Sequence, residues 1–202
     1  MVKLGIAPGA GFATSAVARY LLARQAAAAG ILRSQLERAG ATAADFRDSD
    51  QLAAAAVRYT RAARDQAADE NLTLLAQAMI GIARQQQLWA SDFLKYAEIL
   101  APLSRDELIL IGRMMAEDSA WHRSPEEPDK RPTVWHMVTT SSKLSGLFPD
   151  NEYLEAVAGR AQRSGLILPK TGWGTPIYEL SPIGRAVRGI VDIDAALRET
   201  RR

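Results

Sequence analysis

Apolar residues recur at helical spacing along most of this chain, and only one stretch departs from that period. Two short apolar runs, at 166–168 and 177–180, flank a segment that contains Gly172 and Gly174. Runs of this length on either side of glycines are typical of a two-stranded hairpin, whereas apolar residues three and four apart are typical of amphipathic helices. The sequence therefore predicts a mostly α fold with one β-hairpin near the C-terminal end.

Two helix starts carry clear capping signals. Ser104 is followed three residues later by Glu107, which is the spacing of a capping box. Ser181 precedes Pro182, and proline is favoured at the first position of a helix because its missing N–H would have no partner there. We therefore expect one helix to begin at Ser104 and a closing helix, continuing through Val191, to begin after Ser181.

Other helix limits follow from glycines and short polar residues. The first helix is predicted to begin after Thr14 or Ser15, and Gly30 is predicted to kink or divide it. Ser91 is the predicted cap of a later helix. Together these limits favour a helical bundle of four or five helices over residues 1–103 and a second module over residues 104–202. The expected order in that module is a helix at 104–117, a Pro-rich loop, helices at 133–143 and 150–163, the hairpin and the closing helix.

The second module resembles a known fold. The string Ser164-Gly165-Leu166-Ile167 and the string from Tyr178 to Arg185 resemble the third helix, wing and closing helix of winged helix-turn-helix domains. A weaker similarity, over Leu72–Met79, Phe93–Ile111 and the same wing, is to the abortive-infection alpha family of bacterial proteins. The first resemblance implies a winged-helix-like fold, and the second implies a link to bacterial phage defence.

Charge argues against the DNA-binding use of such a fold. The chain has 25 Lys and Arg against 23 Asp and Glu, but residues 104–202 contain 14 of each and are formally neutral. A DNA-binding domain is expected to carry a basic footprint. We therefore expect a protein-interaction or regulatory module, and a DNA-binding transcriptional regulator is the alternative. The candidate DNA contacts under that alternative are Arg160, Arg163, Lys170, Arg185 and Arg188.

Trp173 is the candidate partner contact in the second module. It lies between Gly172 and Gly174 in the predicted turn of the hairpin. Exposed aromatic residues dominate interface hot spots, so an outward Trp173 would serve as an anchor for a protein partner. The alternative is that the flanking glycines let the indole fold back onto the sheet.

Catalytic and metal-binding motifs are missing from the sequence. The chain has no cysteine and only two histidines, His122 and His136, and it contains neither a Gly-x-Ser-x-Gly elbow nor a His-Glu-x-x-His motif. We therefore expect a protein that is not an enzyme, with no catalytic residue, no metal ligand and no cofactor.

The N-terminal region bears on membranes and self-association. No stretch reaches the 18 or so uninterrupted apolar residues that a spanning helix needs, and we expect a cytoplasmic protein. The apolar stripe is predicted to be core, with peripheral membrane contact as the less favoured alternative, and it consists of Phe12, Val17, Tyr20, Leu21 and Leu22. The alanine-rich seam from Leu52 to Ala63 would allow close helix approach, so we expect the partner to be either a second copy of the chain in a homo-oligomer or another protein.

Overall fold

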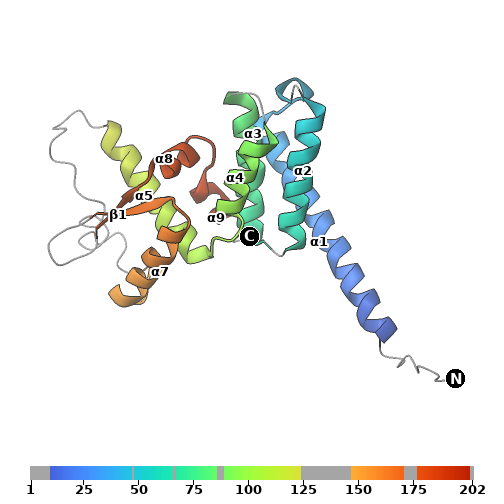
Figure 1. The fold of residues 1–202 in the computed structure, drawn as a ribbon, viewed down its shortest axis with the longest axis horizontal. Helices are drawn as coiled ribbons and strands as arrows, with labels where there is room; N and C mark the ends of the chain where they lie inside the picture. The colour runs from blue at the N-terminus through green and yellow to red at the C-terminus, as the bar shows by residue number, and fades with distance from the viewer. Residues whose placement is uncertain are drawn as a thin grey trace.

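Helices make up most of the protein, as predicted from the sequence. The computed structural model describes residues 10–46, 48–65, 67–85, 89–123, 147–170 and 177–200. Within these residues it contains, in chain order, α1 (Ala10–Ala39), the short helix η1 (Ala43–Asp45), α2 (Ser49–Arg64), α3 (Asp69–Gln85), α4 (Ala90–Leu100), α5 (Arg105–Arg123), α7 (Asn151–Arg163), β1 (Ile167–Lys170), β2 (Ile177–Leu180), α8 (Pro182–Arg188) and α9 (Ile193–Glu199). The mostly α class with one hairpin is therefore confirmed (Figure 1).

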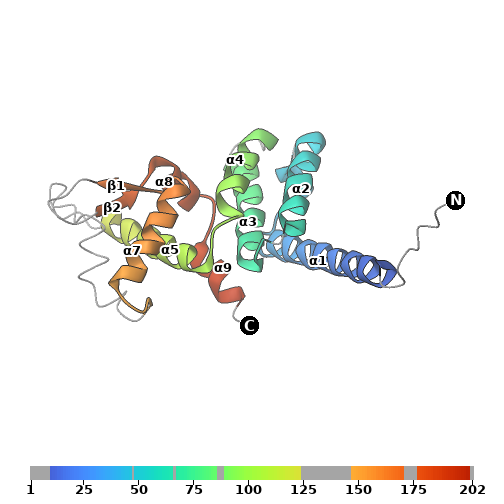
Figure 2. The ribbon, with the colours of Figure 1, turned by 60° about the horizontal axis from the view of Figure 1, so that its bottom comes forward.

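The helix α3 is the centre of the N-terminal half. It packs against α1, α2 and α4 of this half, and α9 from the end of the chain also contacts it (Figures 1 and 2). A helix that is apolar on all sides is stable only when it is buried on all sides, and nearly all of α3 between Glu70 and Ala83 is buried. The positions of the other three helices follow from the need to cover it.

The first helix begins earlier than predicted and is not divided at Gly30. It begins at Ala10, ahead of Thr14 and Ser15, and it continues without a break through Gly30, so both predictions were wrong. Glycine in a helix interior costs only about 1 kcal/mol relative to alanine, and alanines on both sides of Gly30 favour the helix. Packing of the later turns on α3 offsets that cost, while the N-terminal turns extend beyond the end of α2 (Figure 1).

The predicted capping box is present at the start of α5. The Ser104 N–H donates to Glu107 Oε2 over 2.9 Å, and the Glu107 N–H is 3.4 Å from Ser104 Oγ. Ser181 caps α8 as predicted, because its Oγ accepts a hydrogen bond from the Gly184 N–H. Ser91, however, lies inside α4 rather than before it, so that prediction was wrong.

A distant side chain replaces the missing cap of α4. The helix begins at Ala90, and the flanking Trp89 forms no side-chain cap. The Ala90 N–H donates instead to Gln51 Oε1 of α2 over 2.8 Å. The first N–H groups of a helix need hydrogen-bond partners from outside the helix. Here the partner comes from α2, which is distant in sequence, so the residues around Ser91 could not predict where α4 begins.

The C-terminal half is built on α5, which continues to Arg123 rather than ending near residue 117. The strands pair antiparallel, with Ile167 opposite Leu180 and Lys170 opposite Ile177. Helix α7 packs on α5 and on β1, and β2 also contacts α5. The predicted helix at 133–143 lies outside the described residues.

The end of the chain returns to the N-terminal half. Helix α8 ends at Arg188, so the predicted closing helix does not continue through Val191, and α9 begins after its cap Asp192. Helix α9 packs against both α3 and α5. A single cluster of buried side chains extends from Ala28 of α1 to Leu197 of α9, so residues 1–103 and 104–202 share one hydrophobic core.

Candidate functional site

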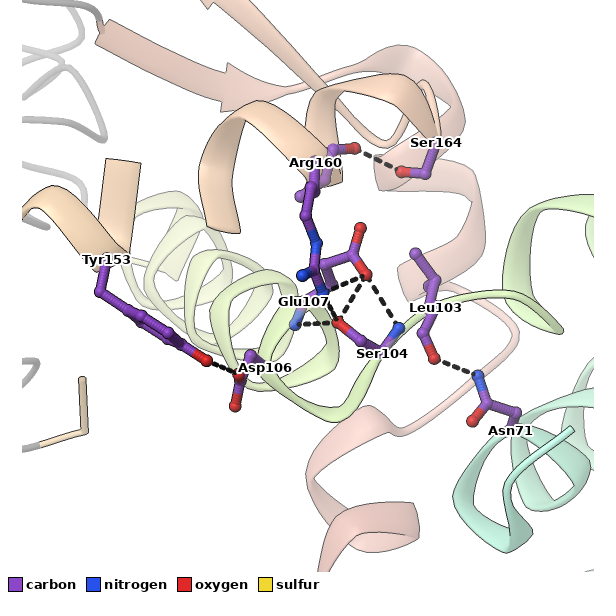
Figure 3. A network of polar contacts seen from close by, with 9 residues as sticks. Asn71, Leu103, Ser104, Asp106, Glu107, Tyr153, Arg160 and Ser164 are labelled. Atoms are coloured by element: carbon purple, nitrogen blue, oxygen red, sulfur yellow. Dashed lines mark hydrogen bonds and ion pairs between the residues drawn. The ribbon is translucent and has the colours of Figure 1, made fainter. Parts of the chain in front are cut away.

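The first turn of α7, which would be the recognition helix of a winged helix, is bound to α5. Asp150 caps the helix by accepting from the Tyr153 N–H, and the Tyr153 hydroxyl donates to Asp106 over 2.5 Å (Figure 3). This hydrogen bond raises the pKa of the Tyr153 hydroxyl above its ordinary value. The bond holds the exposed start of α7 against the start of α5.

Arg160 points from α7 to the capping box rather than outward. Its Nη2 donates to Ser104 Oγ over 2.6 Å and lies 3.5 Å from Glu107 Oε2 (Figure 3). The Ser104 hydroxyl in turn donates to the same carboxylate oxygen over 2.6 Å. The hydroxyl of Ser104, the carboxylate of Glu107 and the guanidinium of Arg160 thus satisfy one another's hydrogen bonds. This arrangement stabilises the start of α5, and it leaves no unpaired general base next to the Ser104 hydroxyl.

The bases of α8 are paired with a carboxylate of α5. Arg188 forms an ion pair with Asp118, and Arg185 Nε lies 3.9 Å from the other oxygen of that side chain. Arg160 therefore binds the first turn of α5, whereas Arg185 and Arg188 bind Asp118 further along the same helix. Three of the five candidate DNA contacts are engaged with acidic residues of the protein itself.

The remaining candidates from the sequence are only partly placed. Arg163 is exposed in the last turn of α7, and Lys170 ends β1 with its side chain outside the described part. Trp173 also lies outside the described residues, as do His136 and the side chain of His122. The described residues contain no group of three or more side chains suited to hold a metal ion.

A cavity of about 710 Å³ lies where α4, α5 and α7 meet. Three basic side chains, Lys95, Arg160 and Arg163, border it together with two acidic ones, Glu98 and Glu107. The apolar part of its lining comes from Ile99, Leu103 and Ile183. Because Arg160 is paired with Glu107, neither of these two charges is free to bind a ligand there.

Large apolar side chains are exposed on α1 and α2. The exposed fractions are 58% for Val17, 52% for Tyr20, 65% for Leu22 and 67% for Val57. The prediction that the α1 stripe is core was therefore wrong for Val17, Tyr20 and Leu22, because the N-terminal turns of α1 extend beyond the helices that could cover them (Figure 2).

A groove lies between these two helices and has a volume of about 650 Å³. It is lined by Leu21 of α1 and by residues of α2, which are Ala56, Val57, Thr60, Arg61, Arg64 and Asp65. A second groove of about 640 Å³ lies between α2 and α4, and Arg58 lines it. Arg61 and Asp65 border both grooves, so α2 separates them. We call the exposed side chains of α1 and α2 together with the first groove the α1–α2 face.

Arginine is the main charged residue around the α1–α2 face. Arg61 Nε lies 3.6 Å from Asp65 in an exposed pair, which contributes little because both groups stay in water. Arg58 and Arg64 form no ion pair with any described residue. In the lining of the first groove, two arginines, Arg61 and Arg64, therefore face one carboxylate, Asp65, whereas Arg58 lines the second groove together with Asp65 and Glu98.

The alanine-rich seam of α2 is used inside the molecule. Ala55, Tyr59 and Ala63 are buried, and the Tyr59 hydroxyl donates to the Ala28 carbonyl of α1 over 2.9 Å. The seam therefore brings α1 and α2 together within one chain. The sequence does contain a signal for the exposed face, because Val57, Arg61 and Arg64 are spaced as neighbours on one side of a helix and place an apolar residue among arginines.

Comparison of the chain with models of protein families, with curated proteins and with solved structures gives no match. No described helix is both long enough and apolar enough to cross a membrane.

Proposed function

We propose that this protein is a non-enzymatic interaction module whose partner-binding surface is the α1–α2 face. The supporting observation is that Val17, Tyr20, Leu22 and Val57 are each more than half exposed on two neighbouring helices. Exposed apolar surface is unfavourable in water, and apolar side chains that gather on one part of a protein surface often mark a place that another molecule covers. The groove beside Val57 gives that surface a concave shape that a partner can fill.

A role in bacterial phage defence belongs to the same proposal and rests on the resemblance to the abortive-infection alpha family. Proteins that act through a partner need a recognition surface rather than a reaction centre. The interlocked side chains of Ser104, Glu107 and Arg160 are consistent with this, since each hydroxyl and charge there already has a partner.

DNA binding is the alternative function. The order α5, α7, hairpin and α8 favours it, because winged helix-turn-helix domains share that order, and Arg163 is exposed on α7. Against it, Arg160 pairs with Glu107, and Arg185 and Arg188 share Asp118, so much of their charge is compensated before any phosphate approaches. A phosphate-driven interaction requires cations that are available to displace counterions.

Two measurements separate the functions. A photoreactive benzophenone amino acid at position 57 should form cross-links to a protein in the cells that make this chain. The same group at position 168, an exposed leucine on β1, is the matched control and should not. Equal cross-linking at both positions would contradict the proposal.

The second measurement addresses DNA. Fluorescence anisotropy of a labelled random duplex should show no binding at about 50 mM salt, a concentration at which phosphate contacts are strong. Binding that weakens steeply between about 50 and 200 mM salt, and that is reduced in an Arg163→Glu variant, would favour the alternative function instead.

A further inference from the structure

We propose that the α1–α2 face binds a helix of a partner protein whose apolar side is flanked by Asp and Glu residues. This inference rests on the proposed function and specifies its partner. The exposed apolar components of the face are Val17, Tyr20, Leu22 and Val57, and Leu21 lines the groove together with Val57. An amphipathic helix laid into a groove presents apolar side chains at three- and four-residue spacing, which is one of the recurring ways in which proteins recognise helical segments.

The charges around the face define the flanks of that helix. Arg61 and Arg64 line the groove of the face, where Asp65 is the one acidic side chain in the lining. Arg58 lies on the side of the second groove, whose lining also contains Asp65 and Glu98. Asp65 is 3.6 Å from Arg61, whereas Arg58 and Arg64 have no ion pair among the described residues. Complementary charge steers association and disfavours partners of like charge, so carboxylates beside the apolar side of the ligand fit this rim.

A second copy of the chain fits less well. A two-fold contact through this face would bring Arg61 and Arg64 of each protomer towards the same two arginines of the other. The seam that favours close helix packing, with Ala55 and Ala63, is already buried against the rest of the molecule. Like charges at the rim and an occupied seam both disfavour self-association here.

Nucleic acid and membrane surfaces fit less well for a different reason. Phosphate groups would pair with the arginines but would leave Val17 and Val57 exposed to water or against polar atoms. A lipid surface could take up apolar side chains, but it is flat, whereas Leu21 and Val57 line a groove of about 650 Å³. A convex apolar ridge with acidic edges, such as one helix supplies, matches both the shape and the charge.

The test uses two synthetic peptides and the full chain. Both peptides carry the same helical row of leucines, and the flanking positions are Glu in one and Lys in the other. Fluorescence anisotropy should show binding of the Glu peptide and at least about tenfold weaker binding of the Lys peptide. Equal binding of the two peptides, or preference for the Lys peptide, would overturn the proposal.

Variants locate the interaction. The Arg61→Glu, Arg64→Glu double variant should reverse the preference between the peptides, while Arg113→Glu, Arg163→Glu, which changes the net charge equally at exposed positions of α5 and α7, should leave it unchanged. Val57→Asp should weaken the Glu peptide at least about tenfold, and the matched Leu168→Asp should not. All these side chains are exposed, so unchanged circular dichroism and melting temperature should show that the variants fold.

The other occupants are outcomes of the same experiment. Light scattering that shows a dimer which Val57→Asp dissociates would identify a second copy as the occupant and overturn the proposal. Sedimentation with vesicles of anionic lipid that depends on Val57 would identify a membrane and also overturn it. If position 57 forms protein cross-links but the chain shows no preference for the Glu peptide, the acidic helix is overturned and the proposed interaction function stands. If position 57 forms no cross-links and neither peptide binds, the proposed interaction function is overturned as well.

Discussion

The side chain of Asn71 joins three parts of the fold. It is 1% exposed, and its Nδ2 donates to the Leu100 carbonyl at the end of α4 over 2.7 Å and to the Leu103 carbonyl before α5 over 2.9 Å. The carbonyls at the end of a helix lack hydrogen-bond donors within that helix. Asn71 of α3 therefore supplies the donor for the carbonyls of the turn between α4 and α5.

Removing that donor should destabilise the protein strongly. We expect Asn71→Ala to lower the free energy of unfolding by about 2–4 kcal/mol, because two buried carbonyls lose a donor and a cavity remains. Asn71→Asp should cost at least as much, since a buried carboxylate would face two carbonyl oxygens. Urea unfolding measures both, and the exposed Gln162→Ala should stay within about 0.5 kcal/mol of the wild type. A change that small for Asn71→Ala would show that the two bonds contribute little.

Tyr59 connects stability to pH. Burial raises the pKa of its hydroxyl, which donates to the Ala28 carbonyl. The folded state therefore holds the phenol proton more tightly than the unfolded state, in which the pKa is about 10. The contribution of this group to stability is complete below that value and is lost as the pH rises above it.

Tyr59→Phe tests this linkage. The variant should lose about 1 kcal/mol of unfolding free energy at pH 7 because the Ala28 carbonyl loses a hydrogen bond. Above about pH 10 its stability should fall less steeply than that of the wild type, because the buried phenol no longer has to ionise. Urea unfolding across this pH range gives both quantities, and Tyr20→Phe, at an exposed position, should keep the wild-type slope. Coincident slopes for Tyr59→Phe and wild type would refute the linkage.

At the scale of elements, Gly159 and Gly184 lie in similar sequences, but only one of them is needed for close packing. Gly184 lies in α8, where a Cβ would come within 2.3 Å of the Leu166 carbonyl oxygen that precedes β1. Gly159 lies in α7, and a Cβ there would meet nothing within 4 Å. Only the first glycine is required, because it allows α8 to pack against the base of the hairpin.

Alanine substitutions should separate the two glycines. Gly159→Ala should raise the free energy of unfolding by about 0.5–1 kcal/mol, since alanine favours the helix. Gly30→Ala in α1, which also has no neighbour within 4 Å, should behave likewise. Gly184→Ala should instead destabilise by more than about 2 kcal/mol, because backbone atoms must move. Thermal and urea unfolding measure all three variants, and a neutral Gly184→Ala would show that α8 can shift away from the hairpin.

The same elements show what sequence alone predicts. Ser104 with Glu107, and Ser181 with Pro182, act within four residues of themselves, and both helix starts were predicted because their signals are local. Gly30 and Ser91 also carry local signals, but packing on α3 and the side chain of Gln51 overrode them. The exposed α1–α2 face could not be predicted from α1, because whether Val17 is core depends on whether another helix reaches it.

At the scale of the whole molecule, the last helix joins the two halves. A Cβ on Gly81 of α3 would lie 2.9 Å from the Ile190 carbonyl oxygen, and one on Gly112 of α5 would lie 3.1 Å from Ile193 Cγ2. Gly81 lets the segment before α9 lie close to α3, and Gly112 lets the first turn of α9 lie close to α5. Hydrogen bonds hold both in place, since the Asp192 N–H donates to Gln77 Oε1 of α3 and Gln35 Nε2 of α1 donates to Glu199 in the last turn of α9.

Because α9 is shared by both halves, the chain should unfold as one cooperative unit. Ile193 and Leu197 are buried, and we expect Leu197→Ala to cost about 2–4 kcal/mol. The transition should shift equally in circular dichroism, which reports on all helices, and in hydrogen exchange of α3 and α5. Arg198→Ala, at an exposed position of the same helix, is the control and should leave the transition nearly unchanged. If Leu197→Ala instead produced two transitions, with α3 still protected after α5 exchanged, residues 1–103 and 104–202 would be independent folding units despite their continuous core.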